Sequence, residues 1–459
     1  MVDSLKLREL ALHEPTTYKP VPFGKEMAKQ FQFDEAWKNM NHGSFGASPR
    51  DIKNKQRQHQ DLCESNPDPF IRYLYPKALD VSREAVAKLL NVPTSTVVFV
   101  PNATTGVNTV LRNIVWKPEG NDEILYFNTI YGACGKTIEY ISEYTHEKVK
   151  GREIPLVYPL EDAALVTQFK EAIGASRKAG KNPRVAVIDS ITSQPGLRVP
   201  FEELIAICAS EGILSMVDGA HGVGHIPLDL SALKPDFFTS NLHKWLFVPR
   251  GCALLYVPEK NQPLIRSPLP TSHGFVPKTP STLVNPLPAS KKSEFVNNFE
   301  FVGTIDNTNY LVVAEALKWR QEVCGGEEAI TDYNIKLAKE GGEVVAKILG
   351  TKILDNATNT LTNCAMVNVQ LPLAVGESKI KTADVGQATK WLLDTAMVEY
   401  RTFVPFLYNQ REKKWWVRLS AQIYLDLDDF KVTAGILKTL CERVEKGEHL
   451  EQKSYYPNH

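Results

Sequence analysis

Residues 217–245 read VDGAHGVGHIPLDLSALKPDFFTSNLHKW and include the ends of two short apolar runs, each followed by side chains that can take part in chemistry. The first run, 213–218, ends at Asp218, and three residues separate the second run, 236–240, from Lys244. Runs of this length and composition predict buried strands. Because ligands of open α/β sheets bind at the carboxyl ends of the strands, we expect Asp218 and Lys244 to face one crevice.

Around this stretch, residues 96–257 alternate short apolar runs with longer amphipathic segments. That alternation is typical of βαβ units and predicts an α/β fold, with a buried, mostly parallel sheet and helices on both faces. The expected strands are 96–101, 123–127, 153–158, 184–189, 213–218, 236–240 and 252–257. The expected helices include 105–115, 161–179 and 201–210. The segments that follow the strands, and so are expected at the crevice, are 102–106, 131, 189–193, 218–221 and 241–244.

The remainder of the chain predicts a second, smaller α+β lobe. Residues 259–290 are rich in Pro and Ser and are expected to form a long surface connection. Beyond them we expect helices at 309–323 and 331–349 and strands at 364–370 and 415–420. The expected division is an N-terminal arm, 1–50, that contributes to the small domain and the site, a large domain, 51–308, and a small domain, 309–459.

Composition excludes several classes of function. Lys plus Arg (53) equals Asp plus Glu (53), so the chain has no basic surplus for binding nucleic acid. No apolar run approaches the ~18 residues of a membrane span, and residues 1–14 lack the apolar core of a signal peptide, so a cytoplasmic location is expected. Seven cysteines without a CxxC or CxxH pair predict neither a disulfide framework nor a metal site.

A buried lysine and a strand-end carboxylate together suit pyridoxal 5′-phosphate. The lysine must lose a proton before it bonds to the cofactor, and burial assists that loss. The carboxylate keeps the pyridine nitrogen protonated, so that the ring can accept electrons. Taken singly, Asp218 is equally well a turn residue or helix cap and Lys244 a solvated lysine. Their order and spacing favour the cofactor site.

Four motifs resemble those of the class V aminotransferases, which are fold-type I pyridoxal-phosphate enzymes with a seven-stranded large domain and a smaller α+β C-terminal domain. The motifs are DGAH at 218–221, SNLHKW at 240–245, NATTG at 102–106 and FVGTID at 301–306. The segment NHGSFG, 41–46, is similar to the branch that contains isopenicillin N epimerase-like proteins. The runs LYFNTIYGACGKTIEY, HKWLFVPRGCA and RSPLPTSHGFVP resemble the branch that acts on hercynylcysteine sulfoxide in ergothioneine biosynthesis.

The resemblance implies roles for the matching residues around the cofactor. Lys244 would hold the cofactor, Asp218 would pair with its ring nitrogen, and His221 would donate near its 3-hydroxyl. Some relatives carry Gln in place of this histidine, and a histidine leaves its tautomer and charge open. The implied phosphate ligands are Thr104, Thr105, Asn241 and His243, with Ser193 a further cofactor contact and Thr304 reaching the phosphate of the partner subunit. The implied assembly is a homodimer with shared active sites. Helix capping is the alternative for Thr104 and Thr105.

Other matches imply substrate contacts. Tyr131 would stack on the cofactor and protonate the leaving group, although a core tyrosine is the alternative. Arg418, in WVRLS, would bind the substrate α-carboxylate through its forked guanidinium, with a surface cation as the alternative. The remaining implied substrate-binding residues are Asn41, His42, Gly43, Ser44 and Arg72. For these, a tight turn and a solvated surface are the alternatives.

The expected activity is that of a pyridoxal-phosphate carbon–sulfur β-lyase. Lys244 would take the Cα proton, the sulfur group would leave Cβ, and pyruvate and ammonia would follow. Hercynylcysteine sulfoxide is the expected substrate, a small-molecule amino acid. Amino acid epimerisation, cysteine desulfhydration and a non-catalytic binding role remain as alternatives. A persulfide mechanism is disfavoured, because only Cys134 is expected near the site.

Overall fold

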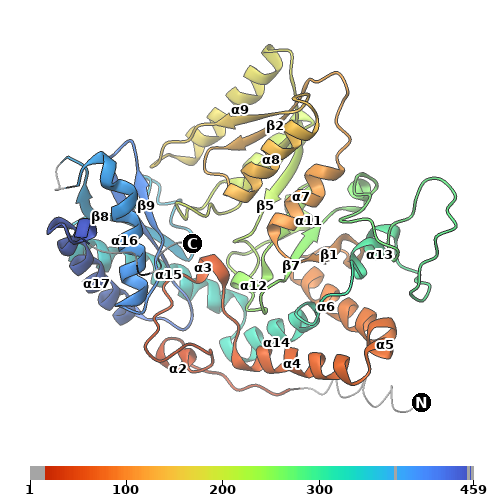
Figure 1. Ribbon diagram of the computed structural model, residues 1–459, viewed down its shortest axis with the longest axis horizontal. Helices are drawn as coiled ribbons and strands as arrows, with labels where there is room; N and C mark the ends of the chain where they lie inside the picture. Colours follow the sequence, from red (N-terminus) through yellow and green to blue (C-terminus); the bar gives the residue numbers. More distant parts are fainter. Residues whose placement is uncertain (1–15, 377–379, 452–454, 456–459) are drawn as a thin grey trace.

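The computed structural model describes residues 16–376, 380–451 and 455, so residues 1–15 of the expected N-terminal arm lie outside the described residues. Two sheets organise the chain and stand next to each other in Figure 1. The larger sheet has the order β1-β7-β6-β5-β4-β2-β3, with β1 Val97–Val100, β2 Asp122–Phe127, β3 Lys150–Ile154, β4 Asn182–Asp189, β5 Leu214–Asp218, β6 Phe237–Ser240 and β7 Ala253–Tyr256. The smaller sheet has the order β8-β10-β9, with β8 Met366–Ala374, β9 Phe406–Asn409 and β10 Lys414–Ser420.

Parallel pairing dominates the larger sheet and confirms the predicted α/β class. Strands β3, β2, β4, β5 and β6 pair in parallel, whereas β7 is antiparallel to both β6 and β1. The prediction for β3, residues 153–158, was displaced toward the C-terminus. This strand is at the sheet edge, and its residues Lys150, Gly151 and Glu153 are exposed, so it lacks the apolar run that marks the central strands.

Alternating side chains of the central strands bind helices on the two faces of this sheet. Val185 and Val187 of β4 belong to the apolar cluster that includes α7 (Ala103–Asn113) and α8 (Gly132–Tyr144). Ala186 and Ile188 belong to the cluster that includes α9 (Asp162–Lys178) and α10 (Phe201–Glu211). The period of two along β4 therefore builds both layers from one strand.

The other helices cover the lower part of the large sheet and the outer face of the small one (Figure 1). Helices α15 and α17 pack on β8. The helix expected at 309–323 corresponds to η4 (Tyr310–Val312) followed by α14 (Val313–Cys324), and the helix expected at 331–349 lies within α15 (Glu327–Leu349). The strands expected at 364–370 and 415–420 overlap β8 and β10. The remaining elements are α2 Lys25–Ala28, α3 His42–Phe45, α4 Arg50–Ser65, α5 Pro67–Pro69, η1 Phe70–Leu74, α6 Tyr75–Leu89, η2 Thr94–Thr96, α11 Leu230–Leu233, α12 Leu242–Trp245, η3 Glu259–Leu264, α13 Glu294–Glu300, η4 Tyr310–Val312, α14 Val313–Cys324, α15 Glu327–Leu349, η5 Thr382–Asp384, α16 Val385–Val398, α17 Leu427–Glu445 and α18 Glu448–Glu451.

Two irregular segments bear on the site. Residues 265–293 contain neither helix nor strand and form a long excursion from the body of the molecule, as the Pro-rich composition predicts (Figure 1). The short helix α3 of the N-terminal segment lies between the two sheets and contacts α12, the helix that carries Lys244. The boundaries of the three expected domains remain a prediction.

Candidate active site

Lys244 lies in α12, directly after β6, and is almost completely buried. Its Nζ is 3.2 Å from Nε2 of His221. Burial, and then the positive charge of Arg418, lower the pKa of Lys244 to about 8. A large share of this amine is therefore unprotonated near pH 8, as a nucleophile or general base requires.

Asp218 ends β5 and is also buried. Its Oδ1 accepts a hydrogen bond from the backbone N–H of Ala220 (2.9 Å), and its Oδ2 accepts one from the thiol of Cys134 (3.2 Å). Within the described part of the chain, neither Asp218 nor Lys244 forms an ion pair. A buried carboxylate without a cationic partner is costly, so this site suits a ligand that brings a protonated nitrogen.

Asp189 belongs to the segment 189–193 that the sequence places at the crevice, although the sequence assigned it no role. It ends β4 and pairs in register with Asp218 of β5, so two carboxyl groups stand at neighbouring strand ends. Burial, and then the negative charge of Asp218, raise the pKa of Asp189 well above its ordinary value. Asp189 therefore binds a proton more readily than an ordinary aspartate. The signal was present in the sequence, because both acids close a predicted strand.

The start of α7 faces the same strand ends. Asn102 caps the helix, its Oδ1 accepting from the backbone N–H of Thr105 (2.8 Å) and from its hydroxyl (3.0 Å). The Oδ1 of Asn241 accepts from the N–H of Ala103 (2.8 Å) and so ties the end of β6 to this helix. The cap is therefore Asn102 rather than Thr104 or Thr105, and Thr104 remains at a helix N-terminus that favours an anion.

His243 follows Asn241 and precedes the lysine. Its Nδ1–H donates to the carbonyl of Cys252 (2.8 Å), and burial lowers the pKa of its ring to about 4. The imidazole is accordingly neutral in the absence of an anion. A bound phosphate would raise this pKa again, because a negative neighbour favours the charged form.

Arg418, on β10, is buried to 1% exposure and has no acidic partner among the described residues. Its Nη2 donates to Oδ1 of Asn41 (2.7 Å) and to Oγ of Ser44 (3.0 Å), while Nη1 donates to the carbonyl of Ser193 (2.5 Å). Its Nε is buried without a hydrogen-bond partner. Burial lowers the pKa of Arg418 to about 10. This guanidinium is held in place with spare donor capacity, which is what an incoming carboxylate needs.

The N-terminal segment 41–46 supports the site by close packing. Gly46 has φ +64°, and a Cβ there would lie 1.8 Å from the carbonyl oxygen of His243. Both ring nitrogens of His42 are occupied, since Nε2–H donates to the carbonyl of Lys244 (2.7 Å) and Nδ1 accepts from the hydroxyl of Tyr424 (2.9 Å). His42 therefore holds the backbone of the lysine rather than facing a ligand.

The resemblance implies that this segment binds substrate, and free backbone N–H groups would suit a carboxylate. Instead, the N–H of Gly43 donates to Oγ of Ser420 (3.3 Å), that of Ser44 to the carbonyl of Asn41 (3.2 Å) and that of Gly46 to the carbonyl of His42 (2.9 Å). The segment winds into the short helix α3, which uses these donors internally. The side chains of Asn41 and Ser44 instead accept hydrogen bonds from the guanidinium of Arg418.

Three predicted residues lie away from the Lys244 cluster or at its border. Tyr131 is half exposed just before α8, and its carbonyl accepts from the N–H of Cys134 (2.8 Å). Arg72 binds Asp68 (3.1 Å) and the carbonyl of Pro286 (2.7 Å), so it fixes the 265–293 excursion. Thr304 is exposed in the loop after α13. None of these contacts assigns the expected roles to the three side chains, which remain predictions.

The cysteines offer no ready thiolate. Cys134 is the one that reaches the cluster, as predicted, and burial together with Asp218 raises its pKa. Burial raises the pKa of the other six as well: Cys63, Cys208, Cys252, Cys324, Cys364 and Cys441. A protonated thiol is a poor nucleophile, which argues against a persulfide mechanism.

The described residues fit pyridoxal 5′-phosphate. Lys244 supplies a neutral amine, Asp218 a buried charge for a protonated ring nitrogen, and the start of α7 an anion site. In the described residues, no group of three or more His, Cys, Asp or Glu side chains is arranged to hold a metal ion. No helix in that part of the chain combines the length and apolar composition that crossing a bilayer requires.

Comparison with known proteins agrees with this geometry. Residues 75–382 match the family model for class V aminotransferases. The chain is 36% identical over 450 residues to the L-cysteine desulfhydrase-like protein lolT1 of Epichloe uncinata, covering 93% of this chain and 97% of the relative. It is 32% identical over 420 residues to the hercynylcysteine sulfoxide lyase of Schizosaccharomyces pombe, covering 91% and 98%. Among solved structures, the cystine C–S lyase C-DES in complex with cysteine persulfide superposes with a TM-score of 0.68 at 18% identity, covering 88% of this chain and 97% of that one.

Proposed function

The chain belongs to the class V aminotransferase family and uses pyridoxal 5′-phosphate, and from this premise we propose that it is a carbon–sulfur β-lyase that cleaves the S-oxide of a cysteine conjugate. The proposed substrate is hercynylcysteine sulfoxide, which with one molecule of water gives a sulfenic acid, pyruvate and ammonia. The observation that carries the proposal is one crevice with a buried Lys244, whose pKa is lowered to about 8, and a buried Arg418 without an acidic partner among the described residues.

Arg418, Lys244 and Asp218 each have a distinct role in the proposed reaction. Arg418 binds the α-carboxylate of the amino acid through its free donor capacity, with Asn41 and Ser44 holding the guanidinium in place. Lys244 takes the proton from Cα, and Asp218 keeps a proton on the cofactor's ring nitrogen. When bound, pyridoxal phosphate supplies an electron sink for the pair left at Cα. The C–S bond then breaks, and the electron pair leaves with sulfur.

Two further roles remain part of the proposal. Tyr131 is exposed enough to meet a ligand, and its phenol is the candidate donor of a proton to the departing sulfur group. Thr304 is exposed on a loop, as a residue that reaches the cofactor phosphate of a second subunit needs to be. We therefore propose a homodimer with shared active sites.

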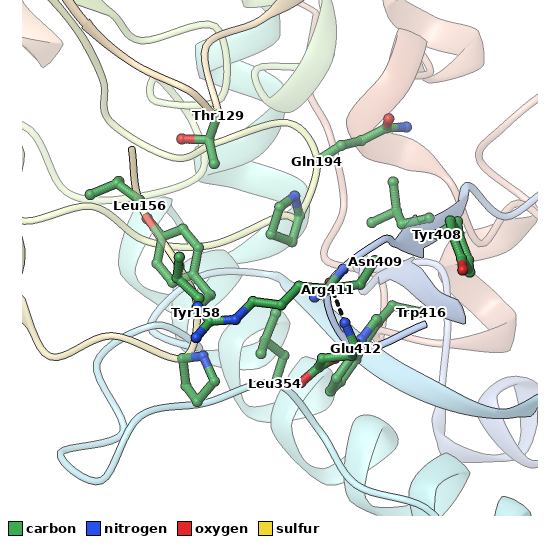
Figure 2. Close-up of a pocket in the computed structure, with 14 residues that line it drawn as sticks. Thr129, Leu156, Tyr158, Gln194, Leu354, Tyr408, Asn409, Arg411, Glu412 and Trp416 are labelled. Atoms are coloured by element: carbon green, nitrogen blue, oxygen red, sulfur yellow. Dashed lines mark hydrogen bonds between the residues drawn. The ribbon is translucent and has the colours of Figure 1, made fainter. Parts of the chain in front are cut away.

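A cavity lined by Gln194, Pro195 and Trp416, among others, supports a substrate larger than cysteine (Figure 2). It encloses about 540 Å³ between the loops after β3 and β4 and the strands β9 and β10. Trp416 lines it and lies on the same face of β10 as Arg418, two residues away, which is about 7 Å along a strand. Gln194 and Pro195 line it as well, directly after Ser193, whose carbonyl accepts from Arg418.

The walls of this cavity suit an S-substituent with an aromatic or cationic part. Aromatic rings come from Tyr158, Tyr408 and Trp416. The hydroxyls of Tyr158 and Thr129 are buried without a hydrogen-bond partner in the described chain. Figure 2 shows the side chain of Arg411 extending across the opening toward Tyr158. A substrate fixed by its carboxylate at Arg418 reaches this cavity with the group on its sulfur, whereas cysteine leaves it empty.

The function is tested by measuring pyruvate release from a panel that contains cysteine, S-alkyl cysteines and their sulfoxides, and hercynylcysteine sulfoxide. We expect stoichiometric pyruvate and ammonia from the conjugate sulfoxides, with kcat/KM well above that for cysteine. Inversion of Cα without pyruvate would instead identify an epimerase. A purified protein without cofactor absorbance and without turnover would identify a binding protein.

Filling the cavity tests its assignment. Leu407 lines the cavity and pairs with Trp416 across the strands, so Leu407→Trp places an indole in the space. We expect kcat/KM for the conjugate sulfoxide to fall by about tenfold or more, because each methylene excluded from a substrate pocket is worth ~1–3 kcal/mol. The same variant should turn over S-methylcysteine sulfoxide within about twofold of wild type. Equal losses on both substrates would remove the cavity from the substrate site.

A further inference from the structure

The indole N–H of Trp245 donates to His221, the histidine that contacts Lys244. This donation determines which ring nitrogen of His221 carries the hydrogen. We propose that Trp245 is a positioning residue that locks His221 in the tautomer with hydrogen on Nε2, so that this N–H points at Nζ of Lys244 and keeps that amine unprotonated. The consequence for turnover rests on the proposed function, but the tautomer itself does not.

The hydrogen-bond geometry determines the tautomer. Trp245 Nε1 is 3.1 Å from Nδ1 of His221, and an indole nitrogen can only donate. Nδ1 of His221 must therefore accept, so the single hydrogen of the neutral ring is on Nε2. That hydrogen faces Nζ of Lys244 at 3.2 Å, where an amine lone pair accepts it and an ammonium N–H would oppose it.

The surroundings keep His221 neutral. The ring is buried, and burial together with the positive charge of Lys244 lowers its pKa well below the ordinary value. The other charged or titratable groups that act on it are Arg418, His225 and His42, and those that act on Lys244 are Arg418, Asp218 and Cys134. Because His221 stays neutral, it can adopt one of two tautomers. The hydrogen bond from Trp245 selects the tautomer with hydrogen on Nε2.

Trp245 cannot turn away from this contact. Its ring is fully buried and stacks on the imidazole of His225, with centroids 3.8 Å apart and planes at 27°. His225 is fixed in turn, since its Nε2 accepts from the N–H of Ala365 (2.6 Å) and its Nδ1–H donates to the carbonyl of His221 (2.8 Å). The contacts with His225 therefore hold the indole N–H of Trp245 in position.

The orientation of His221 is restricted from its other side as well. A Cβ on Gly43 would lie 3.5 Å from Cε1 of His221, so the helix α3 packs against the edge of the ring. A flipped imidazole would present Cδ2 instead of Nδ1 to the indole N–H and would lose that hydrogen bond. The indole therefore selects both the orientation of the ring and its tautomer.

The test removes the N–H and little else. Site-specific incorporation of β-(3-benzothienyl)alanine at position 245 replaces the indole nitrogen by sulfur and keeps the bicyclic shape, with Trp245→Phe as a second variant. In the holoenzyme, the ring ¹⁵N shifts of His221, assigned by their loss in His221→Phe, should report hydrogen on Nε2 in wild type and a shift toward Nδ1 in the variant.

The pH dependence of kcat provides the second readout. Without the Nε2–H donor, the ammonium form of Lys244 gains an acceptor, so we expect the acidic limb of the kcat profile to move up by about one pH unit, a tenfold loss on that limb. In the His221→Phe background the benzothienyl replacement should move neither limb, because its effect passes through the imidazole.

Two results overturn the inference: unchanged ¹⁵N shifts in the benzothienyl variant, or a limb that moves equally in the His221→Phe background. The second result would mean a packing effect of residue 245. If no conjugate is turned over, the proposed function fails while the ¹⁵N measurement still decides the tautomer.

Discussion

Lys244→Ala is expected to lower kcat by roughly 10⁴-fold or more, the upper end of what a positioned general base contributes. The amine of Lys244 is buried, and its pKa of about 8 leaves much of it unprotonated. The structure puts His221 and Asp218 near it, but burial holds the histidine neutral, its Nδ1 accepts from Trp245 and its Nε2 carries the ring hydrogen, so the ring has no free lone pair. No neighbouring group is therefore free to take over the Cα proton.

Borohydride reduction of the wild-type holoenzyme followed by peptide mapping should find the cofactor on Lys244, and the alanine variant should lose that label. Added methylamine should restore part of the activity, because a small amine fits the space that the side chain vacates. As a matched control, Lys136→Ala removes an exposed lysine of α8 that pairs with Glu139. A label on any lysine other than Lys244 would contradict the assignment.

Asp218→Asn is expected to keep cofactor binding and to lose about 10²–10³ in kcat, the usual loss when one electrostatic partner of the reacting system is removed. The amide oxygen can still accept from the N–H of Ala220, so the local fold should persist. What disappears is the negative charge that holds a proton on the ring nitrogen. Cofactor absorbance, content and kcat measured on the same preparation separate binding from turnover.

Asp189→Asn provides the control for this experiment. Burial and the charge of Asp218 raise the pKa of Asp189, so its charged form is disfavoured and an amide is a mild replacement, and we expect a change in kcat of less than about tenfold. In the Asp218→Asn background the charge that raised this pKa is gone, so Asp189 ionises more readily. The double variant should therefore be slower than Asp218→Asn alone. A severe loss in Asp189→Asn by itself would mean that Asp189 carries the charge.

The central strands were predictable because burial on both faces leaves continuous apolar runs, as in Val185–Ile188 of β4. The edge strand β3 was displaced, since Lys150 and Glu153 are exposed there and give no apolar signal. The helices α4, α6, α16 and α17 were not predicted. The hydrophobic faces of these helices pack on elements distant in sequence, so the local pattern alone carries little information about them.

Ligands of open α/β sheets bind at the carboxyl ends of the strands, and this rule predicted Asp218 and Lys244 as site residues. It also indicated the segment that contains Asp189. Local sequence could not reveal that Arg418 has no acidic partner, because this depends on which residues the fold brings within reach. The same holds for Trp245: the motif includes it, but its donation to His221 depends on how the chain returns past the strand end. For segment 41–46 a tight turn was the alternative to substrate binding, and the sequence did not predict that Gly46 packs closely against the carbonyl of His243.

The distance in sequence between Asn41 and Arg418 has a consequence for synthesis on the ribosome. The bond between them spans 377 residues, and the lysine that α3 packs against is made between the two. Asn41, Ser44 and Gly46 are among the first of these residues to leave the exit tunnel, yet their partners do not exist until much later. On the role proposed for Arg418, a nascent chain has no carboxylate site before Arg418 has been translated, so the ability to hold an amino acid arises late, after the large sheet has been released.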